Sequence, residues 1–111
     1  MLVTSAAPLT MPLSAGIQLA VSAPRPNPFA GETRFSVALT QNVEQLDVAV
    51  YELNGRKVAT LWKGLAMAGT RDLVWRRTRD DGTIVPSGVY FIRATSGGES
   101  RGAKVLVLSR N

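Results

Sequence analysis

The chain has 111 residues, of which 45% are apolar, and its formal net charge is +5. It is long enough for one globular domain and too apolar for a disordered tail. It contains no Cys and no His, which excludes disulfides, a zinc site of the usual kind and any catalytic triad built on those residues. We therefore expect a non-enzymatic domain without metal or cofactor.

The charge is distributed unevenly along the sequence. Residues 1–55 carry two basic and four acidic side chains, a net charge of −2, whereas residues 56–111 carry eleven basic and four acidic ones, a net charge of +7. A basic half of this kind is typical of a solvated surface, and it also fits a module that binds anionic glycan or nucleic acid. The sequence leaves both interpretations open.

The first 16 residues form a lead-in that is separate from the expected domain at 17–111. Pro8 and Pro12 interrupt this lead-in, and its Ala, Ser and Thr are typical of an extended linker. No segment of the chain approaches the roughly 18 to 20 apolar residues of a membrane-spanning helix, so we expect no transmembrane segment. From Ile17 onwards apolar and polar residues alternate, and this period of two predicts a β-strand.

Seven segments have the composition and alternation of short strands, and no long segment has the 3.6-residue period of a helix. The expected strands are residues 17–21, 33–40, 46–53, 56–62, 70–75, 88–95 and 102–109. Seven short strands with regularly spaced turns predict an all-β fold, a seven-stranded antiparallel immunoglobulin-like β-sandwich. Because there is no Cys pair, we expect Trp75 or Trp62 to fill the centre of the core.

Turn residues separate the expected strands. The run Pro24-Arg25-Pro26-Asn27-Pro28 is expected to form an irregular crossover or an edge, because proline has no backbone N–H, and Phe29 is expected to close the end of the core. Asn54-Gly55 predicts a hairpin with a type I′ turn, in which both residues have a positive φ. Asp81-Gly82 predicts a turn with Gly82 in the left-handed position.

Two polar segments each have two interpretations. Asp80-Asp81 is a carboxylate pair of the kind that serves acid–base catalysis or Ca²⁺ binding, but D-D-G-T-I lacks the further oxygen ligands of a calcium loop. A turn whose Asp side chains accept backbone N–H bonds is the simpler interpretation. The segment Trp75-Arg76-Arg77-Thr78-Arg79 is either an aromatic and basic nucleic-acid contact or a buried Trp followed by a solvated basic turn. We favour the buried Trp, because no nucleic-acid-binding motif surrounds it.

The segment Val105-Leu106-Val107-Leu108 is apolar on both faces of its expected strand. Strands with two apolar faces are typical of sheet interiors. This strand therefore either lies in the core or has one face covered by a partner, through strand addition at a sheet edge.

Several motifs in the chain occur in an order that is typical of a known family. They are Pro26-Asn27-Pro28-Phe29, V-Y-E-L-N-G-R-K-V at 50–58, Trp75, D-G-T at 81–83, S-G-V-Y-F at 87–91 and K-V-L-V at 104–107. Together they resemble the type A C-terminal sorting domain of proteins exported by the type IX secretion system, over about residues 17–110. The second half is also similar to the Ig-like domain of the flagellar hook-capping protein. The sorting family often has Asp or Asn with Gly after the Trp, where this chain has Arg76-Arg77.

The resemblance to sorting domains implies how this chain would act. It implies that the secretion apparatus of the outer membrane recognises Gly88, Tyr90 and the last strand, namely Lys104, Val105, Leu106, Val107, Leu108 and Arg110. The residues expected to maintain the fold are Pro26, Asn27, Pro28, Phe29, Asn54, Gly55, Trp75, Asp81 and Gly82. It also implies that an N-terminal passenger domain is carried to the cell surface, where a sortase-type peptidase cleaves the chain before Ile17.

On this basis we expect a monomeric sorting signal that is secreted to the cell surface and binds no nucleic acid. A structural Ig-like module of a larger extracellular or hook-capping-like protein is the first alternative. A basic module that binds glycan or nucleic acid is the second.

Overall fold

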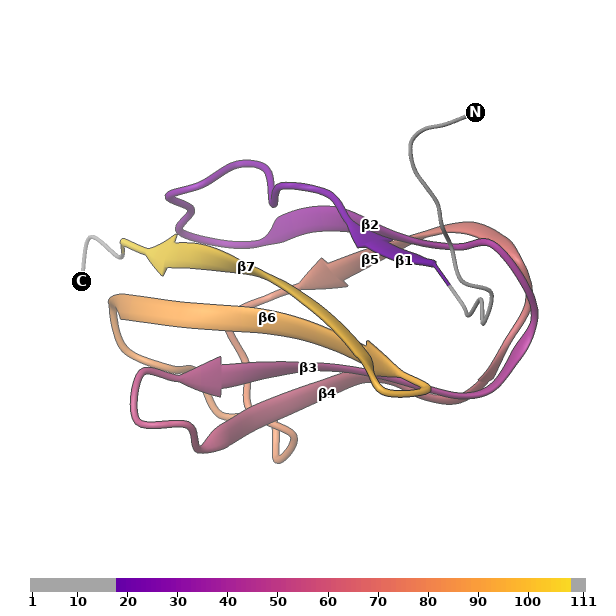
Figure 1. Ribbon diagram of the computed structural model, residues 1–111. Helices are drawn as coiled ribbons and strands as arrows, with labels where there is room; N and C mark the ends of the chain where they lie inside the picture. The colour runs from indigo at the N-terminus through magenta and orange to yellow at the C-terminus, as the bar shows by residue number, and fades with distance from the viewer. Residues whose placement is uncertain (1–17, 109–111) are drawn as a thin grey trace.

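The computed structural model describes residues 18–108, which form two antiparallel sheets packed face to face (Figure 1). The strands are β1 (Leu19–Val21), β2 (Thr33–Leu39), β3 (Val43–Glu52), β4 (Lys57–Ala66), β5 (Gly69–Trp75), β6 (Gly88–Ser96) and β7 (Glu99–Val107). One sheet has the order β1-β2-β5 and the other the order β4-β3-β6-β7. The predicted seven-stranded immunoglobulin-like sandwich is therefore confirmed.

Some sequence predictions concern residues that the structure does not describe. The lead-in of residues 1–16, with the expected cleavage site, lies outside the described residues, and so do Ile17 and Arg110. Within residues 18–108, no helix is long and apolar enough to cross a membrane.

The core lies between the sheets and follows the alternation of the sequence. In β2, for example, Phe35, Val37 and Leu39 are buried, whereas Ser36 and Ala38 between them are only partly buried. Strand β6 contributes in the same way, with Tyr90, Ile92 and Ala94 buried and Arg93 exposed, because successive side chains of a strand point to opposite faces. Fully buried side chains include Leu46, Val48, Val50, Ile92, Val105 and Val107.

Trp75 occupies the centre of the core at one end of the sandwich and is 1% exposed. Its ring meets Phe29 edge to face at a centroid distance of 5.6 Å and Tyr90 at 5.3 Å. Such aromatic pairs add stability beyond the area that they bury. The indole Nε1–H donates to the Thr78 carbonyl at 2.9 Å, so the one polar atom of the ring is satisfied. Of the two tryptophans, Trp75 is therefore the core residue, because Trp62 is only partly buried.

The predicted hairpin at Asn54-Gly55 joins β3 and β4, but its turn is not of type I′. Gly55 has a φ of 90°, whereas Asn54 does not have a positive φ. The Gly55 N–H donates to the Glu52 carbonyl at 2.9 Å, and Asn54 Oδ1 accepts the Arg56 N–H at 3.0 Å. The Asn54 side chain thus bonds to the backbone two residues on, and a single left-handed glycine completes the loop.

Strand β4 continues to Ala66 instead of ending at residue 62, so only residues 67 and 68 connect it to β5. Its pairing with β3 changes register at three places, which are Val43/Leu46, Val48/Ala49 and Val50/Tyr51. Such irregularities bend and twist a strand. Because β4 is an edge strand, they also make its edge a poor template for pairing with another chain.

Candidate recognition surface

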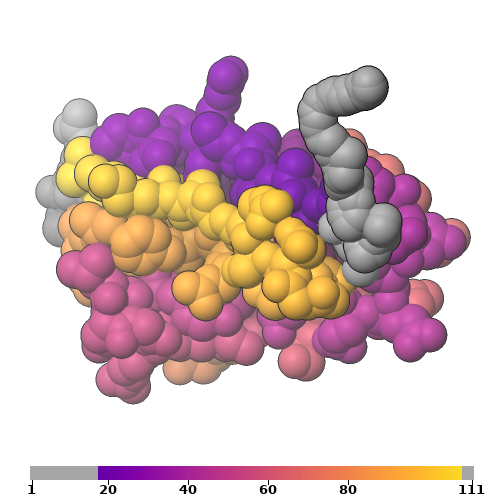
Figure 2. All heavy atoms as spheres, in the orientation of Figure 1, coloured from indigo at the N-terminus to yellow at the C-terminus, as the bar shows by residue number. Residues whose placement is uncertain are grey.

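The segment Pro26–Phe29 covers part of the outer edge of β7, and we call it the edge clamp. In Figure 2 the surface of β7 is bordered on one side by β6 and on the other by the N-terminal part of the described chain. Asn27 makes the first contact: its Nδ2 donates to the Lys104 carbonyl at 3.1 Å, and its Oδ1 accepts the Leu106 N–H at 2.9 Å. One side-chain amide therefore satisfies two backbone groups of an edge strand, as a neighbouring peptide unit would.

The backbone of Phe29 continues this pairing. Its N–H donates to the Leu106 carbonyl at 3.0 Å, and its carbonyl accepts the Leu108 N–H at 2.9 Å. This is a parallel bridge opposite Val107. The clamp is itself held in place, because the buried Thr33 donates its hydroxyl to the Pro26 carbonyl at 2.8 Å. The predicted irregular crossover therefore covers the edge of β7.

The two faces of the last strand have different environments. Val105 and Val107 point into the core and are fully buried, and Phe29 beside them is 3% exposed, so it closes the core end as predicted. Leu106 is partly buried, and Leu108 is 57% exposed. The core interpretation of this strand is confirmed for its inner face, while Leu108 stays available to a partner.

Gly88 and Tyr90 lie directly beside the last strand, where Gly88 pairs with Val107 and Tyr90 with Val105. Tyr90 is 5% exposed and its hydroxyl donates to the Pro86 carbonyl at 2.7 Å. Burial raises the pKa of the Tyr90 phenol, and the negative charge of Glu52 raises it further. Tyr90 therefore packs in the core beneath β7, and it offers little surface to a partner.

The structure brings most of the predicted recognition residues to one end of the sandwich. Gly88, Tyr90 and the β7 segment from Lys104 onwards are joined there by the edge clamp. Of these, the side chains of Lys104 and Leu108 are exposed. Sequence reasoning placed the clamp among the structural motifs and did not link it to the last strand.

The carboxylates Asp80 and Asp81 cap backbone groups, as the simpler interpretation predicted. Asp80 Oδ1 accepts the Thr60 N–H at 2.9 Å. Asp81 Oδ1 accepts the N–H and the hydroxyl of Thr83 at 2.9 and 2.7 Å, and the pKa of Asp81 is lowered, chiefly by the backbone bond. Gly82 has the predicted left-handed conformation, with a φ of 90°. Within residues 18–108 no group of three or more Asp or Glu side chains is placed to hold a metal ion.

The basic turn after Trp75 is built into the fold. Arg76 pairs with Glu32 at 3.2 Å. Arg77 has a φ of 63°, in the left-handed region that Gly and Asn adopt most readily. Its guanidinium compensates by donating to the Val85 carbonyl at 2.8 Å and the Ala30 carbonyl at 3.3 Å. Arg77 is thus a structural residue, and the buried Trp75 has no ring face available to a nucleic-acid base.

The family of the chain follows from a comparison with known protein families. The model of the FlgD Ig-like domain matches residues 23–100, which is more than half of the chain. The chain belongs to the FlgD Ig-like domain family. This FlgD Ig-like domain is 36% identical over 64 residues to the basal-body rod modification protein FlgD of Salmonella typhimurium and of Salmonella typhi. The match covers 58% of this chain and only 28% of each relative, so the chain spans a small part of their length.

Solved structures show the same sandwich. The structure of dimeric latent PorU from Porphyromonas gingivalis is similar with a TM-score of 0.67 at 19% identity, over 86% of this chain and 10% of that one. FlgD from P. aeruginosa is similar with a TM-score of 0.53 at 25% identity, over 68% of this chain and 58% of that one. The CARDB domain of the PF1109 protein from Pyrococcus furiosus has a TM-score of 0.51 at 18% identity, over 83% and 89% of the two chains. The likenesses to PorU and to the CARDB domain concern the fold.

Proposed function

We propose that this FlgD Ig-like domain is a non-enzymatic sorting signal that directs an N-terminal passenger across the outer membrane to the cell surface. Its partners are then the outer-membrane secretion apparatus and a sortase-type peptidase, and the domain acts as a monomer at residues 17–111. The proposal rests on the contact between Pro26–Phe29 and Lys104–Leu108, which the hydrogen bonds of Asn27 and Phe29 hold together. Both motifs belong to the resemblance to sorting domains; Lys104–Leu108 lies outside the residues that match the FlgD Ig-like domain family, and Pro26–Phe29 lies within them.

The geometry assigns different tasks to the residues of the proposed signal. Val105 and Val107 belong to the core, so their role is to hold the strand in place. The exposed side chains of Lys104 and Leu108 are the groups that the apparatus would contact. An exposed apolar side chain beside a basic one offers a small, specific patch on a rigid strand.

The test is an export assay in a bacterium that has a type IX system. A periplasmic reporter is fused to residues 1–111, and surface-exposed reporter is measured by protease accessibility of whole cells. We expect export of the fusion. Retention of a folded wild-type fusion in the periplasm would exclude the sorting role.

Point variants are needed, because deletion of residues 104–111 would also remove Val105 and Val107 from the core. Leu108→Asp places a charge at the proposed contact and should reduce export. Leu65→Asp is the matched control, since Leu65 is 68% exposed on β4, the edge strand on the far side of the same sheet. Equal export of the two variants would exclude Leu108 as a contact.

A structural Ig-like module is the second candidate, and a specific observation favours it. The curated relatives that match this chain are FlgD proteins, in which the matched segment is a part of a longer chain. In this role the domain would pack against neighbouring domains and would not act as a sorting signal. This role is tested by replacing the matched segment of the Salmonella typhimurium FlgD with residues 18–108 and measuring the assembly of flagella. Assembly is expected only if the module retains the contacts that FlgD makes.

A further inference from the structure

The outer face of the sheet β4-β3-β6-β7 carries a row of residues that crosses all four strands. Lys57 pairs with Tyr51, Tyr51 with Phe91, and Phe91 with Lys104. Because adjacent strands are about 4.8 Å apart, the row is roughly 14 Å long at the backbone. Two aromatic rings thus lie between two lysines.

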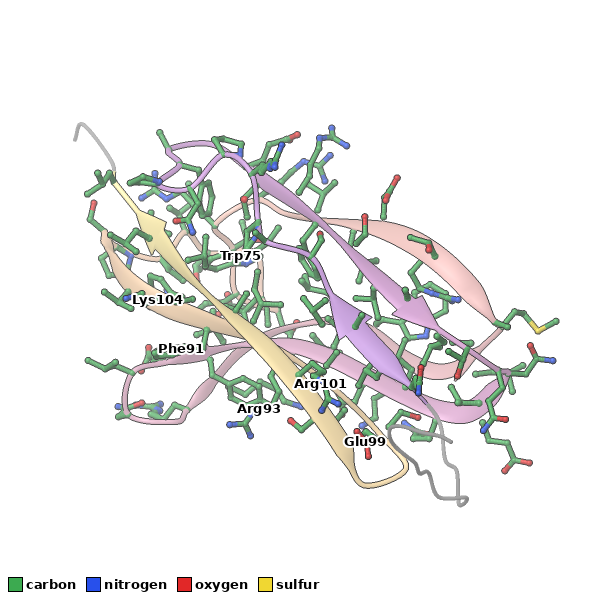
Figure 3. The ribbon with its side chains drawn as sticks, turned by 45° about the horizontal axis from the view of Figure 1, so that its top comes forward. Trp75, Phe91, Arg93, Glu99, Arg101 and Lys104 are labelled. Atoms are coloured by element: carbon green, nitrogen blue, oxygen red, sulfur yellow. The ribbon has the colours of Figure 1, made fainter. Side chains whose placement is uncertain are left out.

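Arg93 adds a third cation to this row. Its guanidinium lies over the ring of Tyr51, 5.5 Å from the centroid. Arg93 follows Phe91 by two residues on β6, so both side chains point to the same face, as Figure 3 allows the reader to follow. We call Lys57, Tyr51, Phe91, Arg93 and Lys104 the outer-face row.

Depressions lie on both sides of Phe91 and Arg93. One has a volume of about 400 Å³ and extends over β7, where Gly102 and Lys104 line it. Gly102 pairs with Arg93, and a Cβ atom at Gly102 would lie 2.8 Å from the Ile92 carbonyl oxygen. The close approach of two strands therefore keeps this position without a side chain and leaves the floor of the depression open.

The second depression has a volume of about 310 Å³ and is lined by Tyr51 and the β3–β4 hairpin. Glu52 also lines it. Glu52 pairs with Tyr90, which is buried on the inner face, so Glu52 belongs to the row that points the other way. Phe91 and Arg93 line both depressions, which therefore flank the middle of the outer-face row.

The charges of the row are not neutralised by the rest of the described chain. Among residues 18–108, Lys57, Arg93 and Lys104 form no ion pair, and all three are exposed. On the same sheet Lys63 pairs with Asp47 at 3.6 Å and Arg101 pairs with Glu99 at 3.1 Å. Unneutralised cations in a row across the sheet favour an extended polyanion.

We propose that the outer-face row binds an anionic polysaccharide, with carboxylate or phosphate groups on Lys57, Arg93 and Lys104 and sugar C–H faces on Phe91 and Tyr51. Arg93 is well placed for this, because a guanidinium that contacts a ring can still donate its N–H groups to an anion. This binding site shares Lys104 with the proposed recognition surface, but its test measures glycan binding and does not depend on the sorting role.

The rings favour a glycan over a single-stranded nucleic acid. Base stacking requires an open aromatic face. The guanidinium of Arg93 lies over one face of Tyr51, and Phe91 is only partly exposed, so neither offers a full stacking platform. A sugar ring presents a smaller apolar face than a nucleic-acid base, so it requires less open ring area.

The test measures binding of the 111-residue chain to polygalacturonate, a carboxylated polysaccharide, by calorimetry. Neutral dextran and single-stranded poly(dT) are compared under the same conditions. We expect binding to polygalacturonate, weaker binding to poly(dT) and none to dextran. No binding to polygalacturonate would overturn the proposal, and tighter binding to poly(dT) would assign the surface to nucleic acid instead.

A charge-matched pair of variants separates the row from general basicity. The variant Lys57→Gln/Arg93→Gln/Lys104→Gln should lose about tenfold in affinity, since three exposed charge contacts together amount to roughly that factor. The control Arg25→Gln/Arg34→Gln/Arg76→Gln removes the same charge elsewhere on the surface and should change affinity by less than about twofold. Equal losses in the two variants, each with the near-ultraviolet spectrum of a packed Trp75, would show non-specific attraction and contradict the site.

Discussion

The side chain of Asn27 takes the place of a neighbouring strand for Leu106, which lies 79 residues further along the chain. The same amide also holds the Lys104 carbonyl. A sheet edge with free N–H and C=O groups is a template for pairing with other chains, and Asn27 satisfies two of those groups. Strand addition by a partner at this part of β7 would therefore first have to displace the edge clamp.

The amide of Asn27 can be tested by its contribution to stability. Asn27→Ala removes both hydrogen bonds and should lower the free energy of unfolding by about 1–2 kcal/mol, measured in urea. Asn27→Asp keeps the acceptor for Leu106 and loses the donor to Lys104, so its effect should be smaller. Gln41→Ala is the control, because Gln41 is an exposed amide in a turn. Equal stability of Asn27→Ala and Gln41→Ala would contradict a role for the clamp.

Arg77 can be tested by a substitution that keeps the charge. Arg77→Lys retains a cation at the left-handed position but loses the planar fork that reaches the Val85 and Ala30 carbonyls. We expect a loss of about 1–2 kcal/mol in unfolding free energy. Arg76→Lys should change it by less than about 0.5 kcal/mol, because the Arg76–Glu32 pair is exposed. If the two lysine variants are equally stable, the guanidinium of Arg77 does not hold this turn.

Gly102 provides a test of the close approach between β6 and β7. Gly102→Ala brings a methyl group to the Ile92 carbonyl and should cost about 1–3 kcal/mol, because the backbones must separate. Gly31→Ala is matched in chemistry, and a Cβ at Gly31 has no neighbour within 4 Å. We expect Gly31→Ala to be neutral or slightly stabilising in thermal unfolding. A neutral Gly102→Ala would show that the strands are farther apart than described.

The buried phenol of Tyr90 predicts how stability depends on alkaline pH. Its pKa in the folded protein is raised above the ordinary value of 10.0, so the neutral phenol stabilises the fold and this contribution is full below pH 10. It is lost as the pH rises through the folded pKa, since the unfolded chain releases the proton earlier. Tyr90→Phe removes the hydrogen bond to the Pro86 carbonyl, so its free energy of unfolding should be about 1 kcal/mol lower at neutral pH. Above pH 10 its free energy of unfolding should decrease less steeply than that of the wild-type protein.

The control for this measurement is Tyr51→Phe, which removes a phenol from the outer face of the sheet. This variant keeps the buried phenol of Tyr90, so its free energy of unfolding should retain the alkaline fall that Tyr90 causes. A Tyr90→Phe protein with the same alkaline fall as the wild type would rule out burial of the Tyr90 phenol as its cause.

Much of the fold could be predicted from local patterns. The alternation of Phe35, Val37 and Leu39 identified a half-buried strand, because burial repeats every second residue in a strand. The type of turn at Asn54 could not be predicted, because the same dipeptide fits two loop geometries and the contact with Arg56 decides between them. The left-handed conformation of Arg77 could not be predicted either, because its guanidinium bonds to carbonyls that are distant in the sequence.

The candidate sites depend on tertiary contacts even more than the turns do. Lys104 and Leu108 are among the recognition residues that the resemblance to sorting domains implied, but their link to the edge clamp depends on how the chain returns to the β7 edge. The outer-face row could not be seen at all, because Tyr51 and Phe91 become neighbours only through strand register. By itself the sequence determined the strands, the core faces and the sandwich, because alternation and turn residues act locally. Only the tertiary structure decided which strands are adjacent and in which register, because those depend on long-range packing of all seven strands at once.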